Sequence, residues 1–160
     1  MKQVAGVYFN IKKLDDAKEW QKKVLDEDPS DADAAYTIGV IDWTEAHQNK
    51  LAALIPTGLT DDGMGNANAP ASVMGRIKEQ NGSLVAEALK YLALAVQLRA
   101  NYDDAMQYLN LVCRQKADLD WDDDDARNQD IAVAQDWTRK AMATRKANEE
   151  SQKNSDSPQP

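Results

Sequence analysis

Residues 14–43, LDDAKEWQKKVLDEDPSDADAAYTIGVIDW, predict two helices joined by a proline turn. In the first helix, apolar residues recur at spacings of three and four, which places Ala17, Trp20 and Val24 on one face. Pro29 cannot continue that helix, because proline lacks an N–H and its ring clashes with the preceding turn. We therefore expect the first helix to end before Pro29 and the second to begin just after it.

The second helix of this stretch contains a glycine on its packing face. We expect the helix to begin with a capping box formed by Ser30 and Asp33. Gly39 shares a face with Ala35 and Ile38, although glycine inside a helix costs about 1 kcal/mol relative to alanine. One interpretation is a glycine that is merely tolerated. We favour the other, in which a neighbouring helix approaches so closely that no side chain fits.

Both helical patterns recur along the chain. The first is a small residue, an aromatic residue three positions on, and a small or β-branched residue four further on. It begins at Ala17 and again at Ala88 and Ala134. The pattern of the second helix has an earlier copy 34 residues before it, around Ala5, and a later copy around Asn110. Paired helices with a period of about 34 residues are typical of tetratricopeptide repeats.

Over residues 1–147 the chain resembles the tetratricopeptide repeat (TPR) family, in particular bacterial members with a GVIDW helix, a long insertion and a later DDAMxYLNLxxR segment. The matching positions are Ala17, Pro29, Gly39, Ala88, Ala95, Leu109, Ala134 and Ala141. The departures from the family pattern are Ala5 and Asn110 in place of glycine, Ala100 in place of proline, and Gln21 and Thr138 in place of an aromatic residue. The resemblance implies an all-α fold, a right-handed superhelical stack of about three helix–turn–helix hairpins whose first helices line a concave groove.

The expected boundaries are repeat 1 at about 1–29, repeat 2 at 30–100, repeat 3 at 101–147 and a disordered polar tail at 148–160. Repeat 2 carries an insertion at 48–82, between its two helices. We expect the insertion to contain a loop from Pro56 to Pro70 and a short helix that ends at Asn81-Gly82. Two roles stay open for the insertion: packing against its own repeat, or covering a ligand as a lid.

The composition excludes several classes of function. The formal charge of −8 argues against nucleic acid as a partner, because phosphates would be repelled. No apolar run is long enough to span a membrane, so we expect a soluble protein. The first residues lack the apolar segment and cleavage site of a leader peptide, so we expect a piece of a longer protein or a mature form. Both a cytoplasmic and a periplasmic or exported location stay open.

No catalytic set, cofactor motif or metal-ligand pattern emerges, so we expect no enzymatic activity. His47 is the single histidine and is expected to be solvated, and Cys113 lies on an apolar stripe, where cysteine is usually a small core residue. The acidic run Asp118–Asp125 lacks the central glycine and terminal glutamate of a calcium loop, and such residues favour the start of a helix. A divalent-metal or small-ligand site in this run and the insertion stays open as an alternative, as does a regulatory domain of a larger protein.

The predicted function is binding of another protein, by a peptide or helix in the concave groove, or assembly with other copies of the chain. Aromatic and arginine side chains are typical anchors of such sites. The predicted groove residues, which neighbour the packing stripe of each first helix, are Phe9, Asn10, Asp33, Tyr36, Val40, Trp43, Gln107, Leu111 and Arg114. The alternative is that Tyr36 and Trp43 pack beneath the insertion.

Overall fold

The computed structural model describes residues 13–155, all of whose regular structure is helical. Its elements are α2 (Leu14–Glu27), α3 (Ala32–Leu54), a short 3-10 helix η1 (Ile55–Thr57), α4 (Ala71–Leu98), α5 (Asp103–Leu119) and α6 (Asp124–Ser155). The predicted all-α class is confirmed. Phe9, Asn10 and the helix expected around Ala5 lie outside the described residues.

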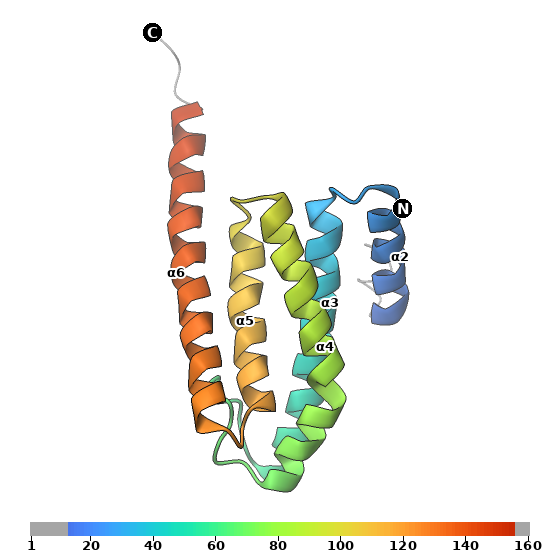
Figure 1. Ribbon diagram of the computed structural model, residues 1–160, viewed down its shortest axis with the longest axis vertical. Helices are drawn as coiled ribbons and strands as arrows, with labels where there is room; N and C mark the ends of the chain where they lie inside the picture. The colour runs from blue at the N-terminus through green and yellow to red at the C-terminus, as the bar shows by residue number, and fades with distance from the viewer. Residues whose placement is uncertain (1–12, 156–160) are drawn as a thin grey trace.

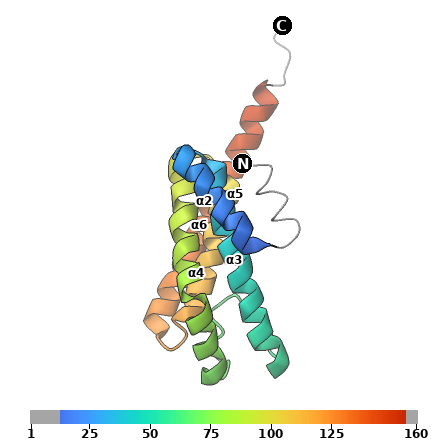
Figure 2. The ribbon, with the colours of Figure 1, turned by 90° about the vertical axis from the view of Figure 1, so that its right-hand side faces the viewer.

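Each helix packs against the next one along the chain, and α3 also packs against α5. The helices run alternately up and down, with α6 at one side of the array and α2 at the other (Figure 1). Viewed from the α2 side, α3 and α4 form a hairpin that α2 crosses near its upper end (Figure 2). The described helices are thus packed in chain order, with an additional contact between α3 and α5.

The turn between α2 and α3 forms where Pro29 predicts it, but the helix cap differs from the expected one. Asp31, not Ser30, caps α3: its Oδ1 accepts hydrogen bonds from the backbone N–H groups of Asp33 and Ala34, both at 3.1 Å. The Ser30 hydroxyl instead donates to Asp28 Oδ1 at 2.6 Å. The carboxylate of Asp31 is a stronger acceptor for helix N–H groups than a hydroxyl, and the serine is left to close the turn.

The close approach predicted at Gly39 is confirmed. A Cβ atom at Gly39 would lie 2.4 Å from Leu92 Cγ and 2.9 Å from Leu92 Cδ2. Leu92 belongs to α4 and is fully buried, in a core with Ala35 of α3, Ala88 of α4 and Leu109 of α5. Only glycine allows α3 and α4 to pack at this distance without moving Leu92.

Positions that the sequence pattern makes equivalent also share their packing. The three small residues that begin the pattern, Ala17, Ala88 and Ala134, are each fully buried. The aromatic residues that follow are each half-buried, with a lysine Nζ 4.5–5.0 Å from the ring centroid in the pairs Trp20–Lys23, Tyr91–Lys90 and Trp137–Lys140. The sequence repeat therefore corresponds to a repeated environment on α2, α4 and α6.

The segment at 48–82 is mostly a lengthening of two helices around a loop. α3 continues to Leu54, and α4 runs without a break through Asn81-Gly82, so the helix end expected there is wrong. Asn81 is buried and its Nδ2 donates to Ala46 O at 2.8 Å, while its Oδ1 accepts from Asn49 Nδ2 at 3.0 Å. These bonds to α3 override the weak helix propensity of an asparagine–glycine pair.

The last helix is longer than expected. α6 reaches Ser155, so the disorder predicted from residue 148 is wrong for residues 148–155, and residues 156–160 lie outside the described part. Asn148 ties the helix to the start of α5, because its Nδ2 donates to Asn101 O at 3.0 Å and to Asp103 Oδ1 at 3.2 Å. Beyond Asn148, α6 projects past the other helices (Figure 1).

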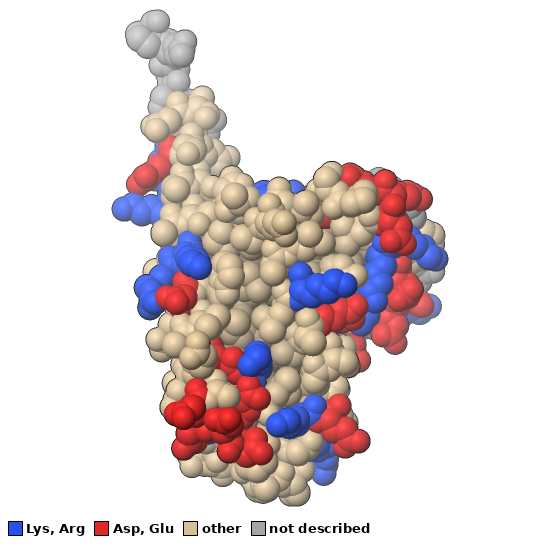
Figure 3. Space-filling view, viewed as in Figure 1, with Lys and Arg blue, Asp and Glu red and all other residues tan. Residues whose placement is uncertain are grey.

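The charged side chains on one face of the molecule gather in two places. Acidic side chains cluster over the start of α6, at the lower left of Figure 3, and acidic and basic side chains alternate over α2 at the right. Within residues 13–155, no helix has the length and apolar character needed to cross a membrane.

Candidate binding surface

Four aromatic side chains form a continuous row, which we call the aromatic row: Tyr36 and Trp43 of α3, Tyr102 at the N-cap of α5, and Tyr108 of α5. The ring centroid of Tyr36 lies 5.0 Å from that of Tyr102 and 5.6 Å from that of Tyr108, and the rings of Trp43 and Tyr108 are 5.2 Å apart. Two of these contacts are edge-to-face, the geometry that the aromatic quadrupole favours. All four side chains are half-buried, so the row packs on the core and also faces solvent.

A charged bridge closes one end of the aromatic row. Asp33 accepts two hydrogen bonds from Arg99, each 2.9 Å, and one from the Tyr102 hydroxyl at 2.8 Å. The Arg99 guanidinium also lies 4.3 Å from the centroid of the Tyr102 ring. Burial raises the pKa of Tyr36 to about 12, and burial and the Asp33 charge raise the pKa of Tyr102, so both phenols stay neutral donors at ordinary pH.

His47 extends the other end of the row. Its ring stacks on Trp43 at 5.1 Å with an angle of 8° between the planes. Burial and the positive charge of Lys50 lower the pKa of His47, so the imidazole is neutral at pH 7. His47 is therefore half-buried against Trp43, and not fully solvated as expected. The signal that could have found it is its spacing of four residues from Trp43, which places the two rings on one helical face.

Leu111 and Arg114 continue one helical face of α5 from Tyr108, because they follow it at successive spacings of three residues. Gln107, Leu111 and Arg114 fall at spacings of four and three, and all are half-buried. Arg114 Nε donates to Asn110 Oδ1 at 2.9 Å, and Arg114 Nη1 donates to Gly63 O at 2.8 Å. Six of the predicted groove residues are thus at least partly exposed: Asp33, Tyr36 and Trp43 on α3, and Gln107, Leu111 and Arg114 on α5. Val40 is only 9% exposed, which makes it a packing residue with little surface to offer.

A buried polar network holds the loop between α3 and α4 in place. Lys50 is 2% exposed, and its Nζ lies 2.9 Å from Asp118 Oδ2 and 2.6 Å from Asp61 Oδ2. Asn66 Nδ2 donates to Asp118 Oδ1 at 2.8 Å, which joins the loop to α5. Burial raises the pKa of Asp118. Burial also acts to raise the pKa of Asp61, but the bond and charge of Lys50, together with hydrogen bonds from Gly63 and Asn66, outweigh burial and lower it. Through these contacts the loop binds α3 and α5. The ring contacts of Tyr36 and Trp43 are with other aromatic side chains, which does not favour the alternative that both pack beneath the insertion.

The acidic run is engaged in pairs and caps. Asp118 binds Lys50, and Asp120 lies 2.9 Å from Lys116. Asp123 Oδ1 accepts from the backbone N–H of Ala126 at 3.0 Å, as expected of a residue that caps α6. In the part of the chain that the structure describes, no three His, Cys, Asp or Glu side chains are placed to hold a metal ion.

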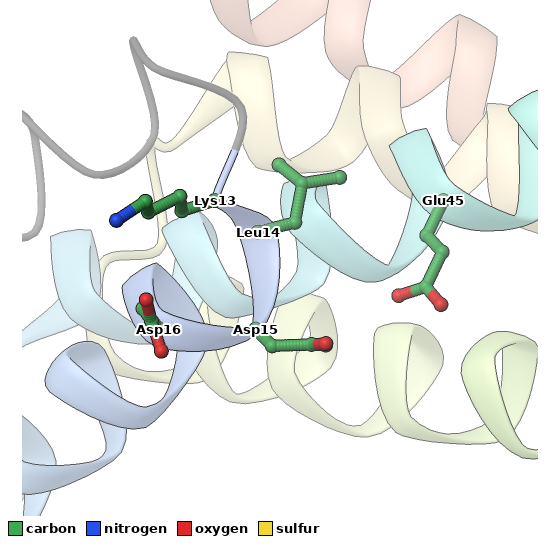
Figure 4. A pocket seen from close by; sticks show the side chains of 5 residues that line it. All are labelled: Lys13, Leu14, Asp15, Asp16 and Glu45. Atoms are coloured by element: carbon green, nitrogen blue, oxygen red, sulfur yellow. The ribbon is translucent and has the colours of Figure 1, made fainter.

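Cys113 and two surface hollows are further features of the described residues. Cys113 is 5% exposed, and burial raises the pKa of its thiol to about 11, as befits the core residue predicted there. A hollow of about 450 Å³ lies beside the start of α2 and is lined by Lys13, Leu14, Asp15, Asp16 and Glu45. The Asp15 and Glu45 carboxylates point into the same gap, and Lys13 points away (Figure 4). A hollow of about 230 Å³ lies in the loop, lined by Gly58, Leu59, Thr60, Asp62, Asn66, Asn68 and Ala69.

Sequence reasoning found the α3 half of the aromatic row but missed Tyr102 and Tyr108. In the repeat alignment Tyr108 corresponds to Thr37, one position away from the predicted groove stripe. Comparison of the chain with models of known protein families, with curated proteins and with solved structures finds no match.

Proposed function

We propose that this chain is a non-enzymatic protein-interaction module of the tetratricopeptide type, which binds a peptide or helix of a partner protein along the aromatic row. In this proposal α2 is the second helix of the first repeat, α3 and α4 form the second repeat, and α5 and α6 form the third. The first helices, α3 and α5, then supply the binding surface.

Two features support the repeat architecture. The packing order, in which α3 contacts α2, α4 and α5, is the one expected when helical hairpins stack on their neighbours. The equivalent residues of α2, α4 and α6 also have the same burial, since Ala17, Ala88 and Ala134 are all fully enclosed. A right-handed superhelical stack of about three hairpins accounts for both features.

The observation that carries the proposed function is the aromatic row itself. Tyrosine and tryptophan are enriched at binding hot spots, because they offer a large apolar area and lose few rotatable bonds on binding. Here three tyrosines and one tryptophan, from α3, α5 and the N-cap of α5, contact one another and remain partly exposed. Their contacts preorganise the surface, which lowers the entropic cost of binding.

The test is selection of binders from a library of random displayed peptides, followed by measurement of their dissociation constants. The proposal expects enriched peptides with apolar or aromatic anchors. Tyr36→Ala plus Trp43→Ala should weaken their binding at least about tenfold, the effect of losing one hot-spot residue. The matched control is Trp20→Ala plus Tyr91→Ala, which removes the same residue types, also half-buried, from α2 and α4.

Circular dichroism must show that both double variants are folded. If the Tyr36 and Trp43 variant is not, Leu111→Lys on the half-buried stripe of α5 takes its place. Equal binding by the wild type and a folded groove variant, or equal losses in the groove and control variants, would reject the α3–α5 surface as the site.

A further inference from the structure

Arg114 differs from the other buried or half-buried basic residues in the described part of the chain. Each of the others has a carboxylate oxygen 2.6–2.8 Å from a side-chain nitrogen, in the pairs Lys18–Asp42, Lys22–Glu87, Lys50–Asp61, Lys116–Asp130 and Arg127–Asp124. Arg114 is half-buried as well, but no carboxylate of the described residues pairs with it. In a chain with a formal charge of −8, an arginine without an anionic partner needs an explanation.

Neutral hydrogen bonds hold the guanidinium of Arg114 in place. Its Nε bonds to the Asn110 side chain on the same helix, and its Nη1 bonds to Gly63 O in the loop, where the Met64 sulfur is also 3.8 Å away. Neither bond uses Nη2, which has no acceptor among the described residues. Because arginine has five N–H donors, the group keeps donors for a further acceptor.

Desolvating a charge without a counter-ion is unfavourable. A ligand carboxylate that pairs with such a charge therefore gains more binding free energy than one that pairs with a fully hydrated lysine. Hydrogen bonds between a guanidinium and a carboxylate are among the strongest in proteins and are directional. Leu111, three residues before Arg114 on α5, places an apolar side chain directly beside it.

We propose that Arg114 binds the carboxylate of an aspartate or glutamate side chain in the partner peptide, next to an apolar residue that packs on Leu111 and Trp43. This inference rests on the proposed function and names the chemistry of its ligand. Neighbouring side chains on a helix face lie about 5–6 Å apart. An extended peptide advances about 3.3 Å per residue, so the acidic residue follows or precedes the apolar anchor by about two positions.

The experiment uses a library of random peptides fused at their C-termini, so that every carboxylate selected belongs to a side chain. The wild type should enrich an apolar or aromatic residue together with Asp or Glu at a fixed spacing of one to three. Arg114→Gln, which keeps hydrogen-bond donors for Gly63 O and Asn110 but loses the charge, should enrich the apolar residue alone. Arg76→Gln, at an exposed arginine of α4, removes the same charge and should leave the motif unchanged.

The dissociation constants of one enriched peptide then form a double-mutant cycle. Replacing its acidic residue by the matching amide should weaken binding to the wild type about tenfold, and should change binding to Arg114→Gln by less than about twofold. The comparison of the acidic and amide peptides on the wild-type protein needs no protein variant, so it remains valid even if Arg114→Gln loosens the loop. Arg114→Lys keeps the charge without the guanidinium geometry, and part of the acidic preference should survive in it.

The outcomes separate this inference from the proposed function. If the wild type enriches no peptide at all, the proposed function fails and this inference with it. If it enriches apolar peptides without an acidic preference, the aromatic row remains a binding surface and the role of Arg114 is refuted. An acidic preference that persists in Arg114→Gln also refutes that role.

Discussion

The contact between Gly39 and Leu92 gives the sharpest test of how α3 packs on α4. In an open helix position, replacing glycine with alanine stabilises a protein by about 0.5–1 kcal/mol. At Gly39 the added Cβ would lie 2.4, 2.9 and 3.2 Å from three carbons of Leu92, all closer than ordinary van der Waals contact. Leu92 is fully buried, and adding a methyl group to a packed core forces side chains off their preferred rotamers, so Gly39→Ala should destabilise the protein by about 1–3 kcal/mol.

The matched control is Gly82→Ala in α4, where an added Cβ has no neighbouring atom within 4 Å. That change should raise the free energy of unfolding, so the two substitutions should have opposite signs. Urea unfolding followed by circular dichroism measures both. If Gly39→Ala is as stabilising as Gly82→Ala, the helices do not approach as closely as described.

A second variant assigns the strain to one side chain. Leu92→Ala alone should cost about 2–5 kcal/mol, because it leaves a cavity in the core. In the Gly39→Ala background the same change should cost at least about 1 kcal/mol less, since the new methyl group occupies part of the cavity. Additive effects of the two changes would refute the argument, because they would mean that the two residues do not touch.

Four further changes test other parts of the fold. Relative to the wild type, Asp42→Asn should raise the free energy of unfolding at pH 7–8 but not near pH 4. Glu87→Gln should lower the free energy of unfolding, and most strongly at neutral pH. Urea unfolding at several pH values measures both effects. Lys50→Met should lower the free energy of unfolding by about 3–5 kcal/mol, because it leaves Asp118 buried without its cation. Urea unfolding at pH 7 measures this loss. Trp20→Ala should cost only about 1–2 kcal/mol, less than for an enclosed tryptophan, because Trp20 is half-buried.

The features that depend on helical periodicity could be predicted from the sequence. The burial of Ala17, Ala88 and Ala134 and the close approach at Gly39 follow from local spacing, because a helix fixes which residues share a face. Tyr36 was placed on the candidate surface by the same argument. These features depend on residues within a few turns of one another.

What depends on contacts between distant segments could not be predicted. The continuation of α4 through Asn81 rests on a bond to Ala46 O, 35 positions away. The loop is held because Asp61 and Asn66 bind the pair of Lys50 and Asp118, which are 68 positions apart. Local helix propensity predicts a helix end at Asn81-Gly82, but propensity is weaker than such buried hydrogen bonds, so α4 continues. Arg114 is the converse case: sequence placed it on the surface, but only the structure reveals that it has no carboxylate partner.

At the junction of α2, α3 and α4, burial and ion pairing decide whether a charged carboxylate stabilises or destabilises the folded state, and only the structure shows both. Asp42 is fully buried, its Oδ1 lies 2.7 Å from Lys18 Nζ, and its Oδ2 has no hydrogen-bond partner among the described residues. Burial raises the pKa of Asp42 from 3.8 to about 6, against the opposing effect of Lys18. The folded state therefore binds a proton more tightly than the unfolded state. The contribution of Asp42 to stability is full below pH 3.8 and is lost as the pH rises through about 6.

A shift of about two pKa units corresponds to about 3 kcal/mol, which sets the upper limit of what Asp42→Asn can recover at pH 7–8. Glu87 lies in the same junction, but its carboxylate is partly exposed and bonds to Lys22 at 2.8 Å. Although burial opposes them, the bonds to Lys22 and Lys18 lower the pKa of Glu87, so its contribution is present at neutral pH and is lost on acidification. Two carboxylates that share Lys18 should thus respond to pH in opposite directions. If Asp42→Asn lowers stability at pH 7–8 more than at pH 4, the attraction of Lys18 outweighs the cost of burying Asp42, and the argument fails.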